Sequence, residues 1–434
     1  MARAAVRDAA IADACPGVLR LHAAADGHLA RVRVPGGRLD ARALDALAEA
    51  ASLGSDIVEL TSRAGLQVRG LPEDRADALA SVLSRGGLLP SVAHDRVRNI
   101  LAAPLAGRGP AALADVDPIV EELDRALCAD ATLAELPGRF LFAVDDGTRA
   151  LEPLRADVEL VAEGDASRAE RDDAFRAERD DASPPERGGA FRLYVDGRAT
   201  SLAVEPAQAP DAALRAAHAF LAVRREDADG AWRVRELRGG AHRLAGQLAL
   251  DAFDRADGPD GTGGAGAGGT GAAGGSRGAG ARRLGVHVQR DGLLAVAVLP
   301  PLARLGREQL MRLAELARAF GADGDIAAGV RVSPWRTVTF VDVPAPTAVG
   351  LLEDLHDIGL VASDASGWAG LSACAGLGAC ARALVDVRAA AAARAVVRDA
   401  TSPAEHWSGC ERRCGEPPGA GVRVVATEHG LVTL

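Results

Sequence analysis

The stretch Leu29-Ala-Arg-Val-Arg-Val34, followed by Pro35-Gly-Gly37, opens a unit that the sequence contains twice. The stretch is strand-like, and the proline and glycines after it indicate a turn. A helix is predicted next, because apolar residues recur at the i, i+3, i+4, i+7 spacing of one buried helical face. Its apolar positions are Leu44, Leu47, Ala48 and Ala51. Short strands are predicted at residues 57–60 and 66–68, which completes a strand–helix–strand–strand unit.

The second copy begins at Leu293-Leu-Ala-Val-Ala-Val298 and is followed by Pro300-Pro301. Its helix repeats the spacing of the first, with Leu310, Leu313, Ala314 and Ala317 as apolar positions. Strands are predicted at residues 330–332 and 338–341. The repetition favours a gene duplication and a pseudo-twofold α+β architecture. The alternative is two unrelated segments with similar α+β patterning.

Two segments are predicted to be unstructured. Residues 163–189 contain 14 charged residues in 27, too little apolar surface to offset the entropy of ordering. Residues 258–280 contain 12 glycines in 23, which is typical of a flexible linker. The linker stands just before the second copy, where a joint between two halves is expected.

Length and composition limit the number of domains and the kinds of partner that can be expected. The chain has 434 residues, which predicts two to four domains, and a formal charge of −10 without a basic tail. We therefore expect no nucleic-acid partner. No run of 18 apolar residues occurs, and Met1 to Leu21 lacks the apolar core of a signal peptide, so a cytoplasmic location without a membrane partner is expected.

Four of the six cysteines lie near the C-terminus in the pattern Cys374-x5-Cys380 and Cys410-x3-Cys414. Without a secretion signal, metal ligation is favoured over disulfides. Four thiolates suit an iron–sulfur cluster or zinc, but structural zinc more often uses closer pairs than x5. The surrounding glycines would let backbone amides approach cluster sulfurs. Zinc and incidental cysteines stay as alternatives.

This cysteine pattern resembles the cluster motif of the sulfite/nitrite reductase superfamily, in which a 4Fe–4S cluster can be coupled to sirohaem through the last cysteine, here Cys414. Further stretches are similar to the precorrin-3B synthase family, the branch of the superfamily in aerobic cobalamin biosynthesis. These stretches are residues 14–22, 59–63, 95–107, 136–142, 333–336 and 408–415. Around Cys374 the threonine, glycine and proline usual in the family are replaced, and Trp407 stands where a smaller residue is usual.

The resemblance implies a fold and its boundaries. We expect duplicated ferredoxin-like half domains plus reductase-like α/β domains in a pseudo-twofold arrangement. The expected segments are 1–91 for the N-terminal arm and first half domain, 92–257 for the first reductase-like domain with its charged insert, and 258–282 for the linker. Residues 283–366 would form the second half domain and 367–434 the cluster domain.

Arg63 and Arg98 match arginines that face the distal side of sirohaem in the reductases, and the resemblance implies catalytic and substrate-binding roles for both. Sulfite reductases place two lysines around a phenylalanine, and the matching positions here are Arg139 and Leu141. The loss of one cation favours the precorrin branch. All fixed cations of this chain are arginines, whose planar fork suits carboxylates. The predicted substrate-binding residues are Arg63, Arg69, Arg96, Arg98, Asn99 and Arg139.

The resemblance thus implies a precorrin-3B synthase-like monooxygenase. It would hydroxylate precorrin-3A at C-20 with O2 and form a γ-lactone. Its cofactors would be a 4Fe–4S cluster on Cys374, Cys380, Cys410 and Cys414, and a second iron centre, either non-haem iron or sirohaem. NADH or NADPH would be the ultimate electron donor, acting through an electron-donor protein, because no dinucleotide fingerprint follows a strand. The alternatives are a sirohaem-dependent sulfite or nitrite reductase, a non-enzymatic iron–sulfur electron carrier or redox sensor, and a zinc-stabilised binding protein.

Overall fold

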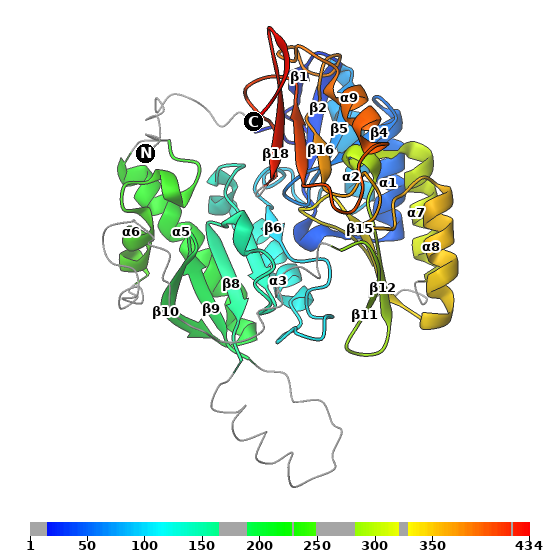
Figure 1. Ribbon diagram of the computed structural model, residues 1–434. Coiled ribbons are helices and arrows are strands. Elements are labelled where there is room, and N and C mark those ends of the chain that lie inside the picture. Colours follow the sequence, from blue (N-terminus) through cyan, green and yellow to red (C-terminus); the bar gives the residue numbers. More distant parts are fainter. Residues whose placement is uncertain (1–14, 165–188, 228–229, 249–282, 321–328, 418–419) are drawn as a thin grey trace. The chain divides into compact units, whose positions relative to one another are not determined.

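The computed structural model describes residues 15–164, 189–227, 230–248, 283–320, 329–417 and 420–434. Its contacts divide these residues into two compact units. We call residues 15–99 and 283–434 the half-domain unit, and residues 100–248 the middle unit (Figure 1). Most of the charged insert and the whole glycine-rich linker lie outside the described residues. Within the described chain, no helix combines the length and the apolar character needed to cross a bilayer.

Two five-stranded sheets form the half-domain unit, and each contains one strand from the other half. The first sheet has the order β1-β2-β5-β4-β13, and the second has the order β11-β12-β15-β14-β3. The first sheet comprises β1 (His22–Ala24), β2 (Gly27–Val32), β5 (Leu66–Leu71), β4 (Ile57–Leu60) and β13 (Arg304–Gly306). The second comprises β11 (Gly285–Val288), β12 (Leu294–Val298), β15 (Val338–Val343), β14 (Val330–Val332) and β3 (Arg38–Leu39). The predicted strands at 57–60 and 330–332 are confirmed at those bounds.

The exchanged strands make the two halves mutually dependent. Short strand β3 leaves the first copy and pairs with β14, so that Leu39 lies opposite Val330. In the other direction β13 pairs with β4, so that Leu305 lies opposite Val58. This reciprocal exchange was not predicted, because two- and three-residue strands carry no periodicity of their own.

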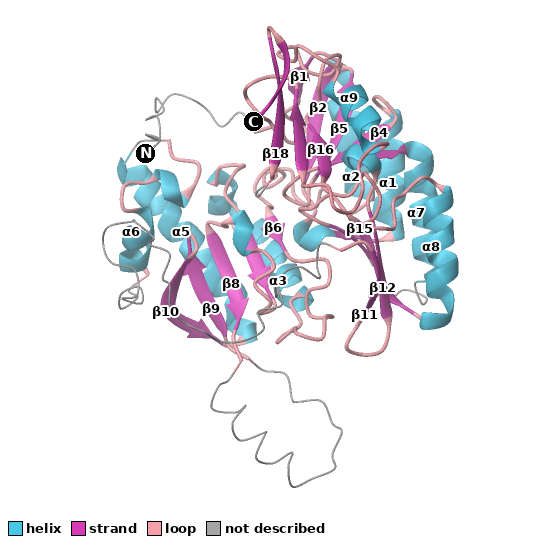
Figure 2. Ribbon diagram, viewed as in Figure 1, coloured by secondary structure: helices cyan, strands magenta, loops and turns pink. Residues whose placement is uncertain are grey.

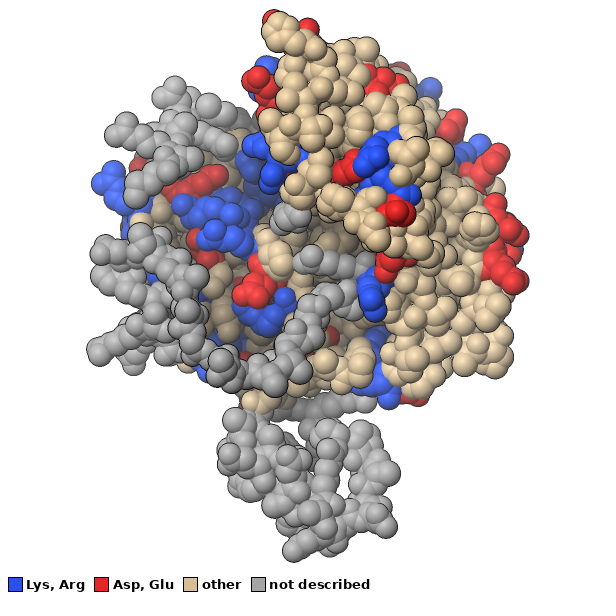
Figure 3. All heavy atoms as spheres, in the orientation of Figure 1, with Lys and Arg blue, Asp and Glu red and all other residues tan. Residues whose placement is uncertain are grey.

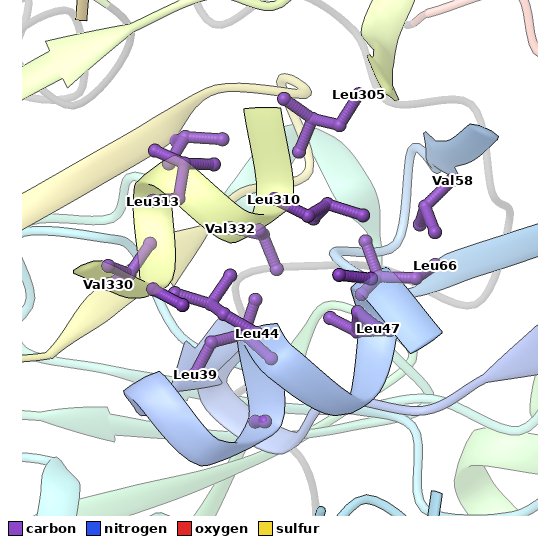
Figure 4. Packing of buried hydrophobic residues seen from close by; sticks show 14 of the residues in the cluster. Leu39, Leu44, Leu47, Val58, Leu66, Leu305, Leu310, Leu313, Val330 and Val332 are labelled. Carbon is purple, nitrogen blue, oxygen red and sulfur yellow. The ribbon is translucent and has the colours of Figure 1, made fainter. Parts of the chain in front are cut away.

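Helices α1 (Ala41–Ser52) and α7 (Arg307–Phe320) are the predicted helices of the two copies, and their apolar faces meet in one core. Leu44, Leu47, Leu310 and Leu313 are each at most 1% exposed. Figure 4 shows side chains from both copies interleaved in this cluster. Fully burying one such leucine contributes about 1.5–3 kcal/mol. Helices α2 (Ala76–Arg85) and α8 (Ala348–Asp357) complete the two half domains.

The turn that leads into β3 depends on glycine. Gly37 has φ of +71°, and a Cβ at this position would lie 2.0 Å from the Val332 carbonyl oxygen. The second copy meets the same backbone requirement without glycine, because Leu302 and Ala303 have φ of 53° and 62°. The close approach of β3 to the second sheet therefore requires a residue without a side chain at position 37.

Gly37→Ala is expected to destabilise the half-domain unit by about 2 kcal/mol or more, because it adds a backbone clash to the cost of a left-handed conformation. Gly292→Ala is the matched control. Gly292 also has positive φ, but a Cβ added there would have no atom within 4 Å. Urea unfolding would measure both variants. Equal losses of stability in the two would show that the contact with Val332 contributes nothing.

The middle unit is built on one mixed sheet with the order β10-β9-β8-β7-β6. Its strands are β6 (Ile100–Leu101), β7 (Phe142–Asp145), β8 (Val158–Ala162), β9 (Phe191–Val195) and β10 (Arg198–Val204). Its helices are α3 (Asp117–Ala129), α5 (Ala209–Asp227) and α6 (Gly240–Gln247). Helix α5 packs against β8 and β9 (Figure 2). Phe140, Phe142 and Phe220 are fully buried in the core of this unit.

A third sheet of the half-domain unit, with four strands, leads into the loops that carry the C-terminal cysteines. Its order is β16 (Leu371–Ala373), β17 (Glu405–Ser408), β18 (Val422–Thr427) and β19 (Gly430–Thr433). The pairs β16–β17 and β17–β18 are parallel. Helix α9 (Val387–Ala395) packs against β16 and β17. Because parallel strands end at the same edge, the loops after β16 and β17 begin side by side.

Candidate functional site

Each cysteine pair follows one of these two parallel strands. We call Cys374–Cys380 the first cysteine loop and Cys410–Cys414 the second cysteine loop. The Cys374 amide donates to the Trp407 carbonyl at 2.9 Å, and the Gly409 amide donates to the Cys374 sulfur at 3.1 Å. The residue just before the second cysteine loop is therefore hydrogen-bonded to Cys374, the first cysteine of the first loop. The local fold brings together the two motifs that the sequence separates.

The four thiols lie close enough to influence one another electrostatically. Burial raises the pKa of the Cys414 thiol, and the nearby Cys410, Cys374 and Cys380 raise it further. All four cysteines are free thiols in the described structure. Among the described residues, no three His, Cys, Asp or Glu side chains converge tightly enough to hold one metal ion. A zinc ion would need all its sulfurs within about 2.3 Å of one point, whereas a 4Fe–4S cluster spreads four cysteines over its corners.

Strand β17 also presents two buried polar atoms that lack partners. Nε2 of His406 and Oγ of Ser408 form no hydrogen bond, although each residue is only 1% exposed. The two residues share one face of the strand, because side chains alternate along it. His406 Nδ1 lies 2.8 Å from Ser372 Oγ, and the Cys414 backbone lies close enough to the ring to raise its pKa. These unpartnered atoms fit a site that accommodates a polar group beside the second cysteine loop.

His406 is neutral at physiological pH. Burial, and after it the Arg336 charge, lower the pKa of its ring to about 4, although Glu416 and the Cys414 backbone oppose the shift. In the sequence, His406 stands four positions before Cys410. Its burial could not be foreseen, because β17 pairs on both sides with strands that have no strong sequence pattern.

The opposite face of β17 is held by a buried ionic network. Glu405 is 2% exposed and accepts hydrogen bonds from Arg394, Arg398 and the Trp407 indole. Burial alone would raise the pKa of Glu405, but the hydrogen bonds from Arg394 and Trp407 and the charges of both arginines lower it overall. Trp407, an unusual residue for the motif, therefore orients the carboxylate that anchors the strand leading into Cys410.

Four of the predicted arginines, Arg63, Arg69, Arg96 and Arg98, belong to the half-domain unit. Arg63 is half-buried in the β4–β5 turn, where its amide donates to Thr61 Oγ1 at 3.3 Å. Arg98 is 4% exposed, and its Nη1 donates to the Leu88 carbonyl at 3.1 Å. Arg96 is half-buried, and its carbonyl accepts a hydrogen bond from Asn99 Nδ2 at 3.1 Å. Asn99 thus stabilises a local turn within the predicted motif.

Two predicted residues differ from the arrangement expected for substrate contacts. Arg69 lies inside β5, not in a loop, and forms a two-point ion pair with Asp26 at 2.9 and 3.0 Å. Its Nη2 also donates to the Ala379 carbonyl in the first cysteine loop. Arg139 belongs to the middle unit, where its guanidinium lies 5.5 Å from the centre of the Trp232 ring. Leu141, two residues on, is 2% exposed.

The duplication extends to two turns, one at Thr61-Ser-Arg63 and the other at Ser333-Pro-Trp-Arg336. In the first, Thr61 Oγ1 accepts hydrogen bonds from the amides of Arg63 and Gly65. In the second, Ser333 Oγ accepts from the amides of Trp335 and Thr337. The fourth residue has positive φ in both, 51° at Ala64 and 64° at Arg336. Equivalent turns therefore present Arg63 in one copy and Arg336 in the other.

The middle unit contains buried acids that the sequence did not reveal. Glu159 in β8 is 4% exposed, and its Oε1 has no hydrogen-bond partner. Burial raises the pKa of Glu159 to about 7, against the lowering effect of the Arg149 charge. Asp157, which pairs with Arg233, has its pKa raised to about 6, chiefly by burial.

Glu159→Gln is expected to change how stability depends on pH. Between pH 4.5 and 7 the unfolded chain releases the Glu159 proton while the folded chain keeps it, so wild-type stability falls as pH rises through this window. The free energy of unfolding of the variant, relative to that of wild type, should therefore rise by about 3 kcal/mol as the pH increases through this window. Urea unfolding from pH 4 to 8 measures this difference. Glu205→Gln, at an exposed carboxylate, is the control, and a constant difference for Glu159→Gln would contradict the prediction.

Both charge signs are interspersed on the face drawn in Figure 3, with no extended basic surface there. All the blue side chains in that view are arginines, since the chain has no lysine.

Comparison with known proteins agrees with this architecture. The family model described as "Nitrite/Sulfite reductase ferredoxin-like half domain" matches residues 22–85 and 287–358. A ferredoxin–nitrite reductase of Synechococcus elongatus is 27% identical over 418 residues, covering 92% of this chain and 76% of the relative. A precorrin-3B synthase of a Sinorhizobium species is 34% identical over 151 residues, covering 34% of this chain and 32% of the relative.

A solved structure described as the Mycobacterium tuberculosis NirA protein superposes with a TM-score of 0.62 at 18% identity. The match covers 94% of this chain and 73% of that one, which shows a shared fold. The family model thus matches two ferredoxin-like half domains within this chain, and the solved structure shares its fold.

Proposed function

We propose that this chain is an iron–sulfur monooxygenase of the precorrin-3B synthase type. It would add one oxygen atom of O2 to C-20 of precorrin-3A and promote γ-lactone formation, with NADH or NADPH as the ultimate electron source. Cys374, Cys380, Cys410 and Cys414 would hold a 4Fe–4S cluster, which when bound supplies electrons one at a time. The donor set supports this, because the Cys414 thiol lies within electrostatic reach of the other three cysteines, and strand β17 presents buried polar atoms without partners just before Cys410.

One observation carries the choice of substrate class. Position 141, where the resemblance to sulfite reductases leads us to expect a second cation, holds a leucine that is 2% exposed. Its amide is fixed by Asp157 Oδ2 at 2.9 Å, so the side chain belongs to the core of the middle unit. A small oxyanion would meet one cation fewer here than in a sulfite reductase. The partial likeness to a precorrin-3B synthase points the same way.

The arginines would serve the carboxylates of the macrocycle. Arg63, Arg96 and Arg98 of the half-domain unit are the proposed contacts, and Arg63 and Arg98 would orient the acetate that forms the lactone. Guanidinium suits this role because it stays charged and grips both carboxylate oxygens. Holding a reacting group in position can supply about 7–11 kcal/mol of barrier reduction.

A second candidate is a sirohaem-dependent nitrite or sulfite reductase. The ferredoxin–nitrite reductase likeness favours it, because that match spans 92% of this chain. This enzyme would receive electrons from a donor protein and would need sirohaem beside Cys414.

Protein purified without oxygen distinguishes the two. About four sulfides per chain with iron, and no Soret-like band, is the result expected for the monooxygenase with non-haem iron. A Soret-like band together with nitrite or sulfite turnover would select the reductase. Zinc without sulfide, or failure to bind any tetrapyrrole, would overturn both. The deciding assay is O2-dependent conversion of precorrin-3A, with nitrite and sulfite reduction measured in parallel.

Arg63→Ala is expected to lower precorrin-3A turnover by at least tenfold while leaving iron and sulfide content unchanged, because it removes a carboxylate contact and not a metal ligand. Arg85→Ala is the control, since Arg85 is exposed on α2 and pairs with Glu49. Steady-state kinetics with precorrin-3A would measure both. Unchanged kcat/KM in Arg63→Ala would remove Arg63 from the substrate site.

A further inference from the structure

Each ferredoxin-like half domain reaches one cysteine loop through an arginine. From the first half, Arg69 Nη2 donates to the Ala379 carbonyl at 2.6 Å, immediately before Cys380. From the second half, Arg336 Nη2 donates to the Gly415 carbonyl at 2.5 Å, immediately after Cys414. Both carbonyls belong to residues that directly flank a proposed ligand.

These contacts fix whole peptide planes. The peptide bond that carries the Ala379 carbonyl also carries the Cys380 amide, which donates to Gly376 at 3.0 Å. The peptide bond after Gly415 carries the Glu416 amide, which donates to Arg413 at 3.3 Å. Each plane is therefore held at both its carbonyl and its amide. The first plane adjoins Cys380 directly, and the second lies one residue beyond Cys414.

The two arginines are themselves held, in different ways. Arg69 is 7% exposed, and its Nε and Nη2 are aligned by the Asp26 carboxylate. Arg336 is set by the positive φ of its turn, and in the described structure it forms no ion pair with an acidic side chain. Burial lowers the pKa of its guanidinium.

A third interaction joins the segment between the two cysteine loops to the half domains. Arg388 in the first turn of α9 pairs with Glu59 in β4. Glu59 also lies 3.9 Å from Arg304, which comes from the exchanged strand β13. Because exchange of β3 and β13 joins the half domains, their arginines form one frame around the two cysteine loops.

We propose that Arg69 and Arg336 are positioning residues that together set the separation and orientation of the two cysteine loops. The proposal rests on the proposed function in that the group so positioned is the cluster held by the four cysteines. Arg69 thereby serves the cluster site, in place of the substrate contact that its sequence motif predicted. Loss of either arginine releases one loop, so that the cluster is held less firmly and in a less uniform geometry.

The test uses Arg69→Met, Arg336→Met and the matched control Arg85→Met in the full chain. The control removes an arginine of the first half domain that lies on α2 and pairs with Glu49. We expect both loop variants to lose iron to a chelator at least fivefold faster than the control, with a broadened EPR signal from the reduced cluster. Urea unfolding of the same proteins separates a local effect from a global one.

Lysine variants refine the test, because lysine is a point donor without a planar fork. Arg336→Lys should restore slow iron loss, since only one carbonyl must be met. Arg69→Lys should not, since the Asp26 pair and the Ala379 contact need two directions at once. If both lysine variants, or neither of them, lost iron as slowly as wild type, the stated geometry would be contradicted.

Hydrogen exchange of the cluster-free protein tests whether the two arginines order the loops when no cluster is bound. Arg69→Met should speed exchange of the Cys380 amide, and Arg336→Met that of the Glu416 amide, each without the other. Normal exchange with normal cluster retention would overturn the inference. Faster exchange in the two variants, combined with a wild-type chain that never binds iron, would sustain the positioning role and overturn the proposed function alone.

Discussion

Replacing both Cys380 and Cys410 with alanine should leave protein without iron or sulfide. The double variant removes one thiolate from each cysteine loop, and the remaining two cannot span a cluster that needs four. The apoprotein should stay folded, because Cys380 and Cys410 are only half-buried and their replacement by alanine removes little core packing. Iron and sulfide should fall from about four per chain to near zero, with loss of precorrin-3A turnover.

Cys128→Ala provides the matched control, because Cys128 is a half-buried thiol on α3 of the middle unit. Its iron and sulfide content should equal that of wild type. If the double variant retained sulfide, the cluster would have other ligands and the assignment of all four cysteines would fail.

Glu405→Gln is expected to be the most destabilising single change in the cluster region. The substitution leaves Arg398, whose side chain is fully buried, without its carboxylate, and it removes the partner of Arg394 and Trp407. Removing one member of a buried pair typically costs 3–5 kcal/mol, although the carbonyls of Gly367, Ala369 and Pro403 retain some hydrogen bonds to Arg398. We expect a loss of about 3 kcal/mol, measured by urea unfolding.

The effect should be largest near the cysteines, because β17 leads directly into Cys410. Iron loss to a chelator should therefore accelerate together with the drop in stability. Glu428→Gln, at an exposed carboxylate of the same sheet region, is the comparison. A Glu405→Gln protein as stable as Glu428→Gln would mean that the arginines are fully satisfied by backbone carbonyls.

Much of the half-domain architecture could be predicted from periodicity. The leucines at 44, 47, 310 and 313 mark helical faces by spacing alone, and the structure buries all four in a shared core. The strand–helix–strand–strand order was confirmed in both copies. These elements were predictable because their burial is set by local patterns of apolar residues.

The residues that hold the candidate site in place were harder to predict from the sequence. Arg69 reads as a polar residue of a half-buried strand, and only tertiary structure shows that it meets Ala379, 310 positions away in sequence. The partnership of Glu405 with Arg398 likewise depends on the packing of α9 against β17. The cysteine spacing identified four candidate ligands, but it carried no information about which half domain contacts each loop.

The exchanged strands impose an order on biosynthesis. Residues 38–39 find their partners only in residues 330–331, so the second sheet gains its last strand from a segment made long before the rest of it. While the ribosome is still producing the second copy, β4 has an unpaired edge that awaits β13. Such edges are sites for wrong pairing between chains, and closure over so long a sequence separation is slow. Expression of either copy alone should consequently yield aggregates or strand-swapped dimers, and co-expression of the two fragments should restore soluble material.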